Sequence, residues 1–333
     1  MFEFLKSHME NIFQAIHAFE SSVGCFVNAL LIYVVLTKSP KQIQGYGLLI
    51  INFAVTDFLI CVLNYMLMQR LIICGFAVIY ISMGPCSKIS TQLCFTIYVT
   101  KLHLYTHSIW LLLISFLYRY YVMIRSELSK YKIQFIIFLF YLPSLLSMGN
   151  IFISDGSEKE AREVLTECHP DYNITNRAVT GNISYLDVGA IYVVIHIVGM
   201  SIPIAIMIWI MRRKIIAKLG SNASSERSKR LQLQLLKALT FQSCIPIFYV
   251  LGSSGFAVQQ FNIINNAAPQ YIMYCVFILV PVLNPFSSFI FITPYRKYVI
   301  SLFDRKSYKI SVTQTTTQLN SSAINQSQSL SKH

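Results

Sequence analysis

A few polar and charged side chains lie inside long apolar stretches of the sequence, where each of them must find a partner. Asn28, Asp57 and Asn284 carry amide or carboxylate oxygens that can bind water, a small cation or one another. Arg119 can bind a carboxylate, an amide or a partner protein. These groups suit hydrogen bonding and ion binding rather than acid–base catalysis, because Asp57 is the only acid deep in an apolar stretch and a second, paired carboxylate is lacking.

The sequence carries none of the short motifs that mark common enzymes. Gly-x-Ser-x-Gly, His-Glu-x-x-His and the phosphate-binding P-loop are all absent. His103 and His107 are four residues apart and could approach one metal ion from a helix face. Neither a carboxylate nor a cysteine accompanies them in a recognisable metal motif, and no Cys-x-x-Cys pair occurs. We therefore expect no enzymatic activity, no cofactor and no metal site.

Membrane spans are the elements that must position these polar groups. Of the 333 residues, 55% are hydrophobic and only 12% are charged, about half the charged fraction of soluble domains. A net charge of +13 could suit nucleic acid, but the mean hydropathy of +0.55 leaves too little polar surface for a soluble basic module. We expect an all-α membrane protein, a seven-transmembrane helix bundle in the lipid bilayer that binds no nucleic acid. Seven apolar runs are long enough to cross a bilayer: 14–37, 47–70, 89–123, 131–153, 187–213, 232–258 and 268–292.

The remaining segments lie outside these spans. The apolar run 71–83 has thirteen residues, too few to cross, and is expected to form a packed outer loop or to extend the second span. Segment 1–13 is expected to be an extracellular N-terminus, and no signal peptide is expected there, because charged residues stand where its apolar core would be. After the last span we expect a short amphipathic helix over 294–310 and a disordered cytoplasmic tail over 311–333, which is rich in Ser, Thr, Gln and Asn.

The distribution of basic residues predicts the orientation of the bundle. If the C-terminus lies inside, 20 of the 27 Lys and Arg residues fall in inner segments together with only three acids, and the outer segments hold six basic residues and nine acids. Basic residues concentrate on the cytoplasmic side, so the N-terminus is expected outside. Two glycosylation sequons, at Asn173 and Asn182 in the outer loop between spans four and five, agree with this orientation. Three more sequons on the inner side show that such patterns also arise by chance.

Taken in order, the polar residues and prolines of the spans resemble those of the rhodopsin-like G-protein-coupled receptors. The matching residues are Asn28 and Asp57 in spans one and two, Arg119 within Tyr118-Arg119-Tyr120, Pro203, Pro246, and Asn284-Pro285. The resemblance implies that Asn28, Asp57 and Asn284 form a polar cluster around water or sodium. It also implies that Arg119 meets a heterotrimeric G protein once span six swings outward.

Three positions depart from that family's pattern. Tyr118 replaces the acid before the arginine, Ser288 occupies the terminal tyrosine position of the Asn-Pro-x-x-Tyr signature, and Cys244 occupies the tryptophan position two residues before Pro246. The usual lock between acid and arginine and the usual aromatic toggle of span six are therefore missing.

Four short stretches resemble a narrower group, the nematode serpentine chemoreceptors of class delta (Srd). They are 84–86, 115–121, 235–242 and 294–296. What this group implies is a receptor of sensory neurons for environmental chemicals.

Prolines inside the spans are expected to allow gating. Pro246 removes a backbone donor and its ring clashes with the preceding turn, so span six should kink there and pivot. Pro203 and Pro285 should act likewise in spans five and seven, although a static kink without a role in switching is the alternative. The residues expected to carry the switch and the G-protein contact are Tyr118, Arg119, Tyr120, Pro246, Asn284 and Pro285.

Helical spacing predicts a ligand pocket around Lys101. Tyr98, Lys101, Tyr105 and Ser108 fall on one helix face at three- and four-residue steps. The resemblance implies a ligand contact at Lys101, where a cation would favour an anionic or carbonyl-bearing ligand. The alternative is that Lys101 snorkels outward. By the same resemblance His196, Tyr249 and Tyr274 point toward the pocket, with core packing as the alternative role for each.

The resemblance also implies a disulfide between the outer loop after span four and the beginning of span three. Cys168 is the loop cysteine. Its partner is Cys94, which stands 25 residues before Arg119, or Cys86 in the Gly84-Pro85-Cys86 stretch. Spacing slightly favours Cys94.

The function expected from these residues is that of a G-protein-coupled chemosensory receptor for an extracellular small molecule. The plasma membrane is the expected location, with the sensory cilium as a candidate compartment. A multi-span transporter or channel is the alternative, although transporters often show internal repeats and none relates the two halves of this chain.

Overall fold

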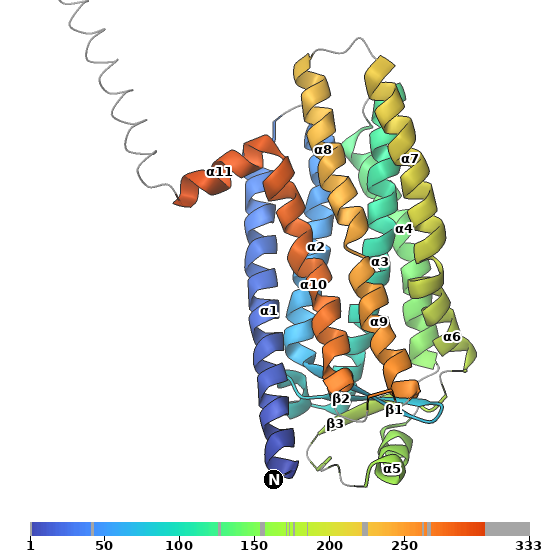
Figure 1. The fold of residues 1–333 in the computed structure, drawn as a ribbon. Helices are drawn as coiled ribbons and strands as arrows, with labels where there is room; N and C mark the ends of the chain where they lie inside the picture. The colour runs from blue at the N-terminus through green and yellow to red at the C-terminus, as the bar shows by residue number, and fades with distance from the viewer. Residues whose placement is uncertain are drawn as a thin grey trace, which may run out of the picture.

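Long apolar helices run side by side along one axis, and a small β-sheet closes one end of them (Figure 1). This computed structural model describes residues 2–40, 43–125, 128–153, 157–170, 172, 174–175, 177–184, 186–221, 226–261, 263–264 and 268–303. The mostly helical membrane fold expected from the sequence is confirmed. Within the described part, six helices are long and apolar enough to cross a bilayer: Met9–Lys38, Gln44–Leu67, Thr91–Ile124, Lys130–Phe152, Lys229–Gln260 and Ala268–Phe291.

The helices follow the apolar runs closely. The unbroken ones are α1 (Phe2–Lys38), α2 (Gln44–Leu67), α3 (Thr91–Ile124), α4 (Lys130–Ile153) and α10 (Ala268–Phe291). The predicted fifth span is divided among α6 (Val188–Val194), the π-helical turn η3 (Ile195–Gly199) and α7 (Ser201–Ser221), and the sixth between α8 (Glu226–Cys244) and α9 (Ile247–Gln260). Helix α1 begins at Phe2, so the expected N-terminal segment 1–13 is not separate from the first helix.

The two divided spans break for different reasons. At Pro246 the missing backbone N–H interrupts the ladder, and the next amides bond close by, Phe248 N to Ile245 O (3.0 Å) and Tyr249 N to Pro246 O (2.9 Å). In span five the break lies before Pro203, at η3, where Met200 N donates to Ile195 O (2.9 Å). The interruption thus lies in the turn that precedes Pro203 and ends at Gly199, the residue whose carbonyl a proline at position 203 leaves without its helical donor. Helix α10 continues through Pro285.

The run 71–83 forms most of a β-hairpin, a packed loop rather than an extension of the second span. Strand β1 (Gln69–Cys74) pairs antiparallel with β2 (Ala77–Ser82), which pairs antiparallel with β3 (Ala178–Asn182). Gly75, with φ of +60°, supplies the left-handed residue of the two-residue turn between Cys74 and Ala77. The sheet thus joins the loop after span two to the loop after span four.

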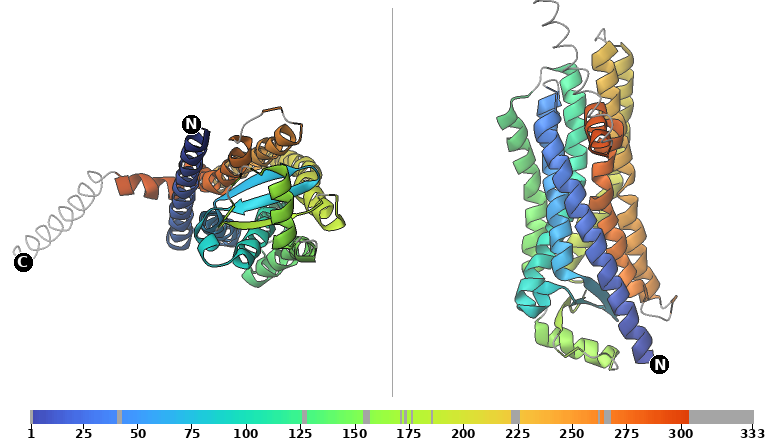
Figure 2. Two further views of the ribbon diagram at one scale, coloured as in Figure 1. Left: turned by 90° about the horizontal axis from the view of Figure 1, so that it is seen from below. Right: turned by 90° about the vertical axis from the view of Figure 1, so that its left-hand side faces the viewer.

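Both faces of this sheet are buried. Leu71, Val78 and Tyr80 join the helical core, while Ile72 and Ile79, which alternate with them, face a second core. Helix α5 (Glu158–Cys168) covers that second face, and a capping box of Ser157 and Glu160 fixes its start. Figure 2 shows the sheet and α5 lying across the ends of the membrane helices.

At the opposite end, α11 (Thr293–Phe303) leaves α10 at a steep angle (Figure 1). It occupies the first part of the amphipathic segment expected over 294–310. Tyr295 is buried where the two helices meet, and its hydroxyl lies 2.6 Å from Ser39 Oγ after α1. Residues 304–310 and the expected tail over 311–333 lie outside the described residues.

Candidate functional site: an outer cavity and an inner arginine

A cavity of about 480 Å³ lies beneath the sheet, between the helices at the end of the bundle that carries the sheet. Leu71, Val78 and Tyr80 of the sheet form part of its wall, opposite Met273 and Phe277 of α10. Most of its lining is apolar. The lining residues with a polar side-chain group are Tyr80, Tyr98, Asn182, Ser253 and Tyr274. Its volume lies within the range of small-molecule sites, which run from about 300 to 1,000 Å³.

Lys101 points into the protein rather than outward to lipid. Its side chain is fully buried, and Nζ donates to Gln69 Oε1 of β1 (2.9 Å) and lies 4.5 Å from the ring centre of Tyr274. Tyr98 and Tyr274 line the cavity, whereas Lys101 is not among its lining residues. The ammonium group therefore fastens α3 to the sheet, beside the cavity.

The other predicted pocket residues pack around the cavity. Tyr105 and Tyr249 meet edge to face at 5.4 Å, and both contact Phe277, which does line the cavity. His196 Nε2 accepts a hydrogen bond from Trp110 Nε1 (2.9 Å), and the neighbouring Ile195 takes the lining position. This aromatic cluster connects the cavity to the middle of the bundle.

Two of the three predicted polar-core residues meet directly. Asn284 Nδ2 donates to Asp57 Oδ2 (2.9 Å), tying α10 to α2. Asn28 Nδ2 instead donates to the backbone oxygens of Gly24 and Pro281, both at 2.9 Å. The buried oxygens Asp57 Oδ1 and Asn28 Oδ1 accept no hydrogen bond from the described residues. Such oxygen donors fit water or a hard cation such as sodium.

The C-terminal end of α3, opposite the sheet, is tied to α8 by Arg119. Its Nη1 donates to Gln232 Oε1 (2.5 Å), and its guanidinium stacks 4.2 Å from the ring centre of Tyr46 on α2. Tyr118 packs against Tyr46 as well, with 6.4 Å between ring centres. Lys214 Nζ of α7 lies over the ring of Tyr120, 5.8 Å from its centre. A neutral amide on span six thus holds the arginine.

The predicted disulfide is wrong. Cys86 is bonded to Cys94, with 5.3 Å between their Cα atoms, and Cys168 is bonded to neither. The short 3-10 helix η2 (Pro85–Lys88) and the Ser90 N-cap of α3 fold the chain back, so two cysteines eight residues apart meet locally. Cys168 ends α5 on the far face of the sheet, away from span three.

One of the two glycosylation predictions is also wrong. Asn182 lies in β3, is only 8% exposed and lines the cavity, so a glycan cannot be accommodated on it. Side chains of a strand alternate between the two faces of its sheet, and both faces are buried here, so the sequon at Asn182 is not accessible. Asn173 lies outside the described residues.

The histidine pair considered for metal binding is an aromatic contact. His107 stacks on Tyr141 with 3.5 Å between ring centres, and His103 lies 5.7 Å from the same ring. Two other groups of side chains lie close enough to share an ion, and the sequence alone did not connect their members. They are Cys74, Cys168 and His169 at the sheet, and His17, Glu20 and Cys275 between α1 and α10.

Sequence reasoning missed the sheet and therefore the part of the cavity wall that the sheet forms. A signal was present, because the apolar residues of 69–74 and 77–82, rich in Ile and Val, flank Gly75 and Phe76 as a hairpin would require. The pairing with β3 had no comparable signal, since about a hundred residues separate the two strands. Tyr80 and Asn182 reach the cavity only through this pairing.

A multi-span helical bundle with a cavity at one end, a buried Asp–Asn pair and basic residues at the other end is typical of a serpentine, receptor-type membrane protein. The family model of the serpentine type 7TM GPCR chemoreceptor Srd matches residues 13–301. Serpentine receptor class delta-18 of Caenorhabditis elegans is 37% identical over 283 residues, which cover 83% of this chain and 84% of the relative. Class delta-1 of the same organism is 32% identical over 290 residues, covering 85% and 78%. The chain belongs to the Srd family, a family of chemoreceptors rather than of enzymes.

Proposed function

We propose that this chain is a chemosensory receptor of the plasma membrane that couples to a heterotrimeric G protein, with the sheet and N-terminus outside. The excess of basic residues at the inner ends of the helices supports this orientation. The Cys86–Cys94 disulfide at the sheet end also supports it, because disulfides persist in oxidising compartments. The sensory cilium is a specialised part of the same membrane and is compatible with this topology.

The ligand is a small, mostly apolar molecule with few hydrogen-bonding groups. This class follows from the lining of the cavity. Tyrosines, one serine and one asparagine supply its polar groups, and none of the described residues that line it is charged. A charged ligand would lose its hydration without gaining an ion pair there. The anionic ligand suggested by Lys101 is therefore less well supported than a neutral one.

The observation that carries the proposal is the Arg119–Gln232 hydrogen bond, which ties α3 to span six below the break at Pro246. In this conformation the arginine is occupied within the bundle. Outward rotation of α8 about the break separates Gln232 from Arg119 and frees the guanidinium for a G protein. A ligand that binds the open conformer better shifts the population toward it, and the G protein does so reciprocally.

Replacement of the arginine tests the proposal. Arg119→Ala is expected to reduce receptor-dependent nucleotide exchange on a purified G protein to the level without receptor, while surface expression is retained. Arg125→Ala is the matched control, because Arg125 is an exposed arginine at the end of the same helix.

Exchange should remain in the control variant. Normal exchange in Arg119→Ala would contradict the proposal, and ligand flux through liposomes without any G protein would favour a transporter instead.

A further inference from the structure

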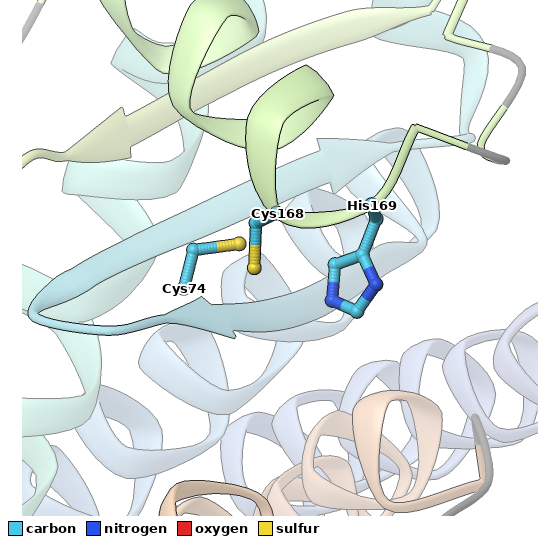
Figure 3. Close-up of side chains that lie close together, drawn as sticks. All are labelled: Cys74, Cys168 and His169. Atoms are coloured by element: carbon cyan, nitrogen blue, oxygen red, sulfur yellow. The ribbon is translucent and has the colours of Figure 1, made fainter.

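Two cysteines that are 94 positions apart in the chain lie close together at the second apolar core, between the sheet and α5. Cys74 is the last residue of β1, and its side chain is only 7% exposed on the sheet face that α5 covers. Cys168 is the last residue of α5 and is exposed. The two sulfurs and a ring nitrogen of His169 all lie within 4.8 Å of one another. Figure 3 shows the two sulfurs pointing toward each other across the gap between helix and strand.

We propose that Cys74 and Cys168 form a second disulfide, which fastens α5 to the hairpin above the cavity. The inference rests on the proposed function in one respect, that the sheet faces the cell exterior. Cys86–Cys94 lies at the same end of the bundle and is already bonded, so the compartment that oxidises one pair is available to the other. Both partners are held by packing, because Ala161 and Leu165 of α5 are fully buried against the sheet.

The exposure of the two thiols sets the order of the reaction. Burial raises the pKa of the Cys74 thiol, whereas Cys168 is open to solvent. The Cys168 thiolate therefore attacks an exchanging disulfide of the oxidising compartment, such as oxidised glutathione or the disulfide of an oxidoreductase. This forms a mixed disulfide and releases one thiol. Cys74 then loses its proton and attacks Cys168 Sγ, releasing the second thiol, so that the pair gives up two electrons and two protons to the oxidant.

The cross-link would act on the ligand site through the sheet. Cys74 lies on the face toward α5, and Leu71 of the same strand lies on the face toward the cavity. With α5 tethered, the hairpin is held between helix and bundle from both sides. A reductant that breaks the bond would loosen the sheet above the cavity, although neither cysteine lines the cavity.

A zinc ion held by the same two sulfurs and His169 is the competing occupant, because Cys and His are zinc ligands. His169 separates the two cases. His169→Ala leaves a Cys74–Cys168 disulfide intact and removes one ligand of a zinc site. His169 also stacks on Tyr172, with 4.6 Å between ring centres, and takes no part in the proposed Cys74–Cys168 bond.

The test is peptide mapping of the full-length receptor after free thiols are blocked with N-ethylmaleimide without reductant. Trypsin leaves Cys74 and Cys86 together in 71–88, with Cys94 in 89–101 and Cys168 in 163–177. Chymotrypsin cuts after Phe76 and Tyr80 and so separates Cys74 from Cys86. We expect a Cys74 peptide linked to the Cys168 peptide, in the wild type and in His169→Ala alike. Maleimide on Cys74 and Cys168 beside an intact Cys86–Cys94 link would overturn the proposal, as would labelling that a zinc chelator makes possible.

Labelling of intact cells with a membrane-impermeant maleimide separates this proposal from the topology beneath it. Although Cys168 is exposed, it should stay unlabelled in the wild type and become labelled in Cys74→Ser. Labelling of wild-type Cys168 would overturn the disulfide but leave the outside location intact. If Cys168 is labelled in Cys74→Ser only after the cells are permeabilised, the sheet does not face the exterior and the proposed orientation fails with the disulfide.

Discussion

The end of the bundle that carries the sheet, which we propose to be the outer end, and the opposite, inner end are held together by different kinds of interaction. At the outer end, two antiparallel strand pairings, the second apolar core between the sheet and α5, and the Cys86–Cys94 bond hold the chain around the cavity. At the inner end, one side-chain hydrogen bond among the described residues, from Arg119 to Gln232, joins α3 to α8. Backbone ladders and disulfides resist opening more than a single side-chain bond does. This difference suits the proposed receptor, whose ligand would bind at the more rigid end and whose G protein would couple at the end that opens more easily.

Glycine-to-alanine changes at the two ends should show the difference most strongly. A Cβ on Gly181 of β3 would lie 2.6 Å from Val78 O, a backbone atom, so the strand pairing must shift. Overpacking of this kind costs about 1–3 kcal/mol. We expect Gly181→Ala to lower the unfolding temperature of the purified receptor and to reduce the folded yield.

Gly45 at the opposite end of the bundle and Gly149 at a site without close neighbours complete this comparison. A Cβ on Gly45 would meet the hydroxyl of Tyr118, the movable end of a side chain, so Gly45→Ala should be tolerated better. A Cβ on Gly149 would meet no atom within 4 Å, so Gly149→Ala should not lower stability. Equal losses in Gly181→Ala and Gly45→Ala would refute the contrast between the two ends.

Filling the cavity should weaken ligand response without changing the inner end. Ser253 of α9 lines the cavity, and the adjacent Ser254 is exposed. If Ser253→Phe adds about 1–3 kcal/mol of steric penalty to the bound state, potency falls about 5- to 150-fold. The measurement is the dose response of expressing cells to an agonist found by screening volatile and water-soluble metabolites. Ser254→Phe should keep wild-type potency, and an equal loss in both variants would place the ligand elsewhere.

Removing the acceptor of Arg119 should raise ligand-independent activity. A hydrogen bond to a charged group contributes about 1.5–3 kcal/mol, so Gln232→Leu should increase basal nucleotide exchange by about tenfold. Gln234→Leu is the control, because this amide on the same helix accepts from Thr293 N rather than from Arg119. Unchanged basal exchange in Gln232→Leu would mean that the bond does not hold the closed conformer.

The smallest effect is expected at Lys101. Because this ammonium is held by Gln69 beside the cavity rather than in its lining, Lys101→Met should change the potency of a neutral agonist by less than about threefold. Lys88→Met, at an exposed position before α3, controls for the loss of one outer charge. A much larger loss, confined to carboxylate-bearing agonists, would show that Lys101 reaches the ligand and would restore the anionic class.

Local sequence signals predicted the helical part of this fold well. Apolar runs long enough for a bilayer marked the helices because a spanning segment must satisfy its own backbone hydrogen bonds. The Asp57–Asn284 contact was implied by the resemblance to rhodopsin-like receptors, and it gives each of two polar groups in apolar surroundings a partner. The interruption at Pro246 followed from a missing donor.

Long-range pairing was beyond those signals. The side-chain partners of Cys168 and Asn182 depend on β3 joining a hairpin about a hundred residues earlier, and nothing in either segment specifies the other. A cysteine 25 residues before Arg119 suggested one disulfide, whereas the local turn at η2 produced another. The acceptor of Arg119 was equally hidden, because a glutamine in an amphipathic helix carries no mark of its partner.

The π-helical turn η3 shifts the angular register of the fifth span. Its i to i+5 hydrogen bond, from Met200 N to Ile195 O, accommodates one residue more than an α-helical turn would. Each residue of an α-helix advances the face by about 100°, so positions on either side of η3 are offset by that angle from an uninterrupted helix. Ile195 lines the cavity, whereas the resemblance to the receptor family pointed to His196. Contact positions transferred from a receptor without such a turn will therefore hold on one side of η3 and fail on the other.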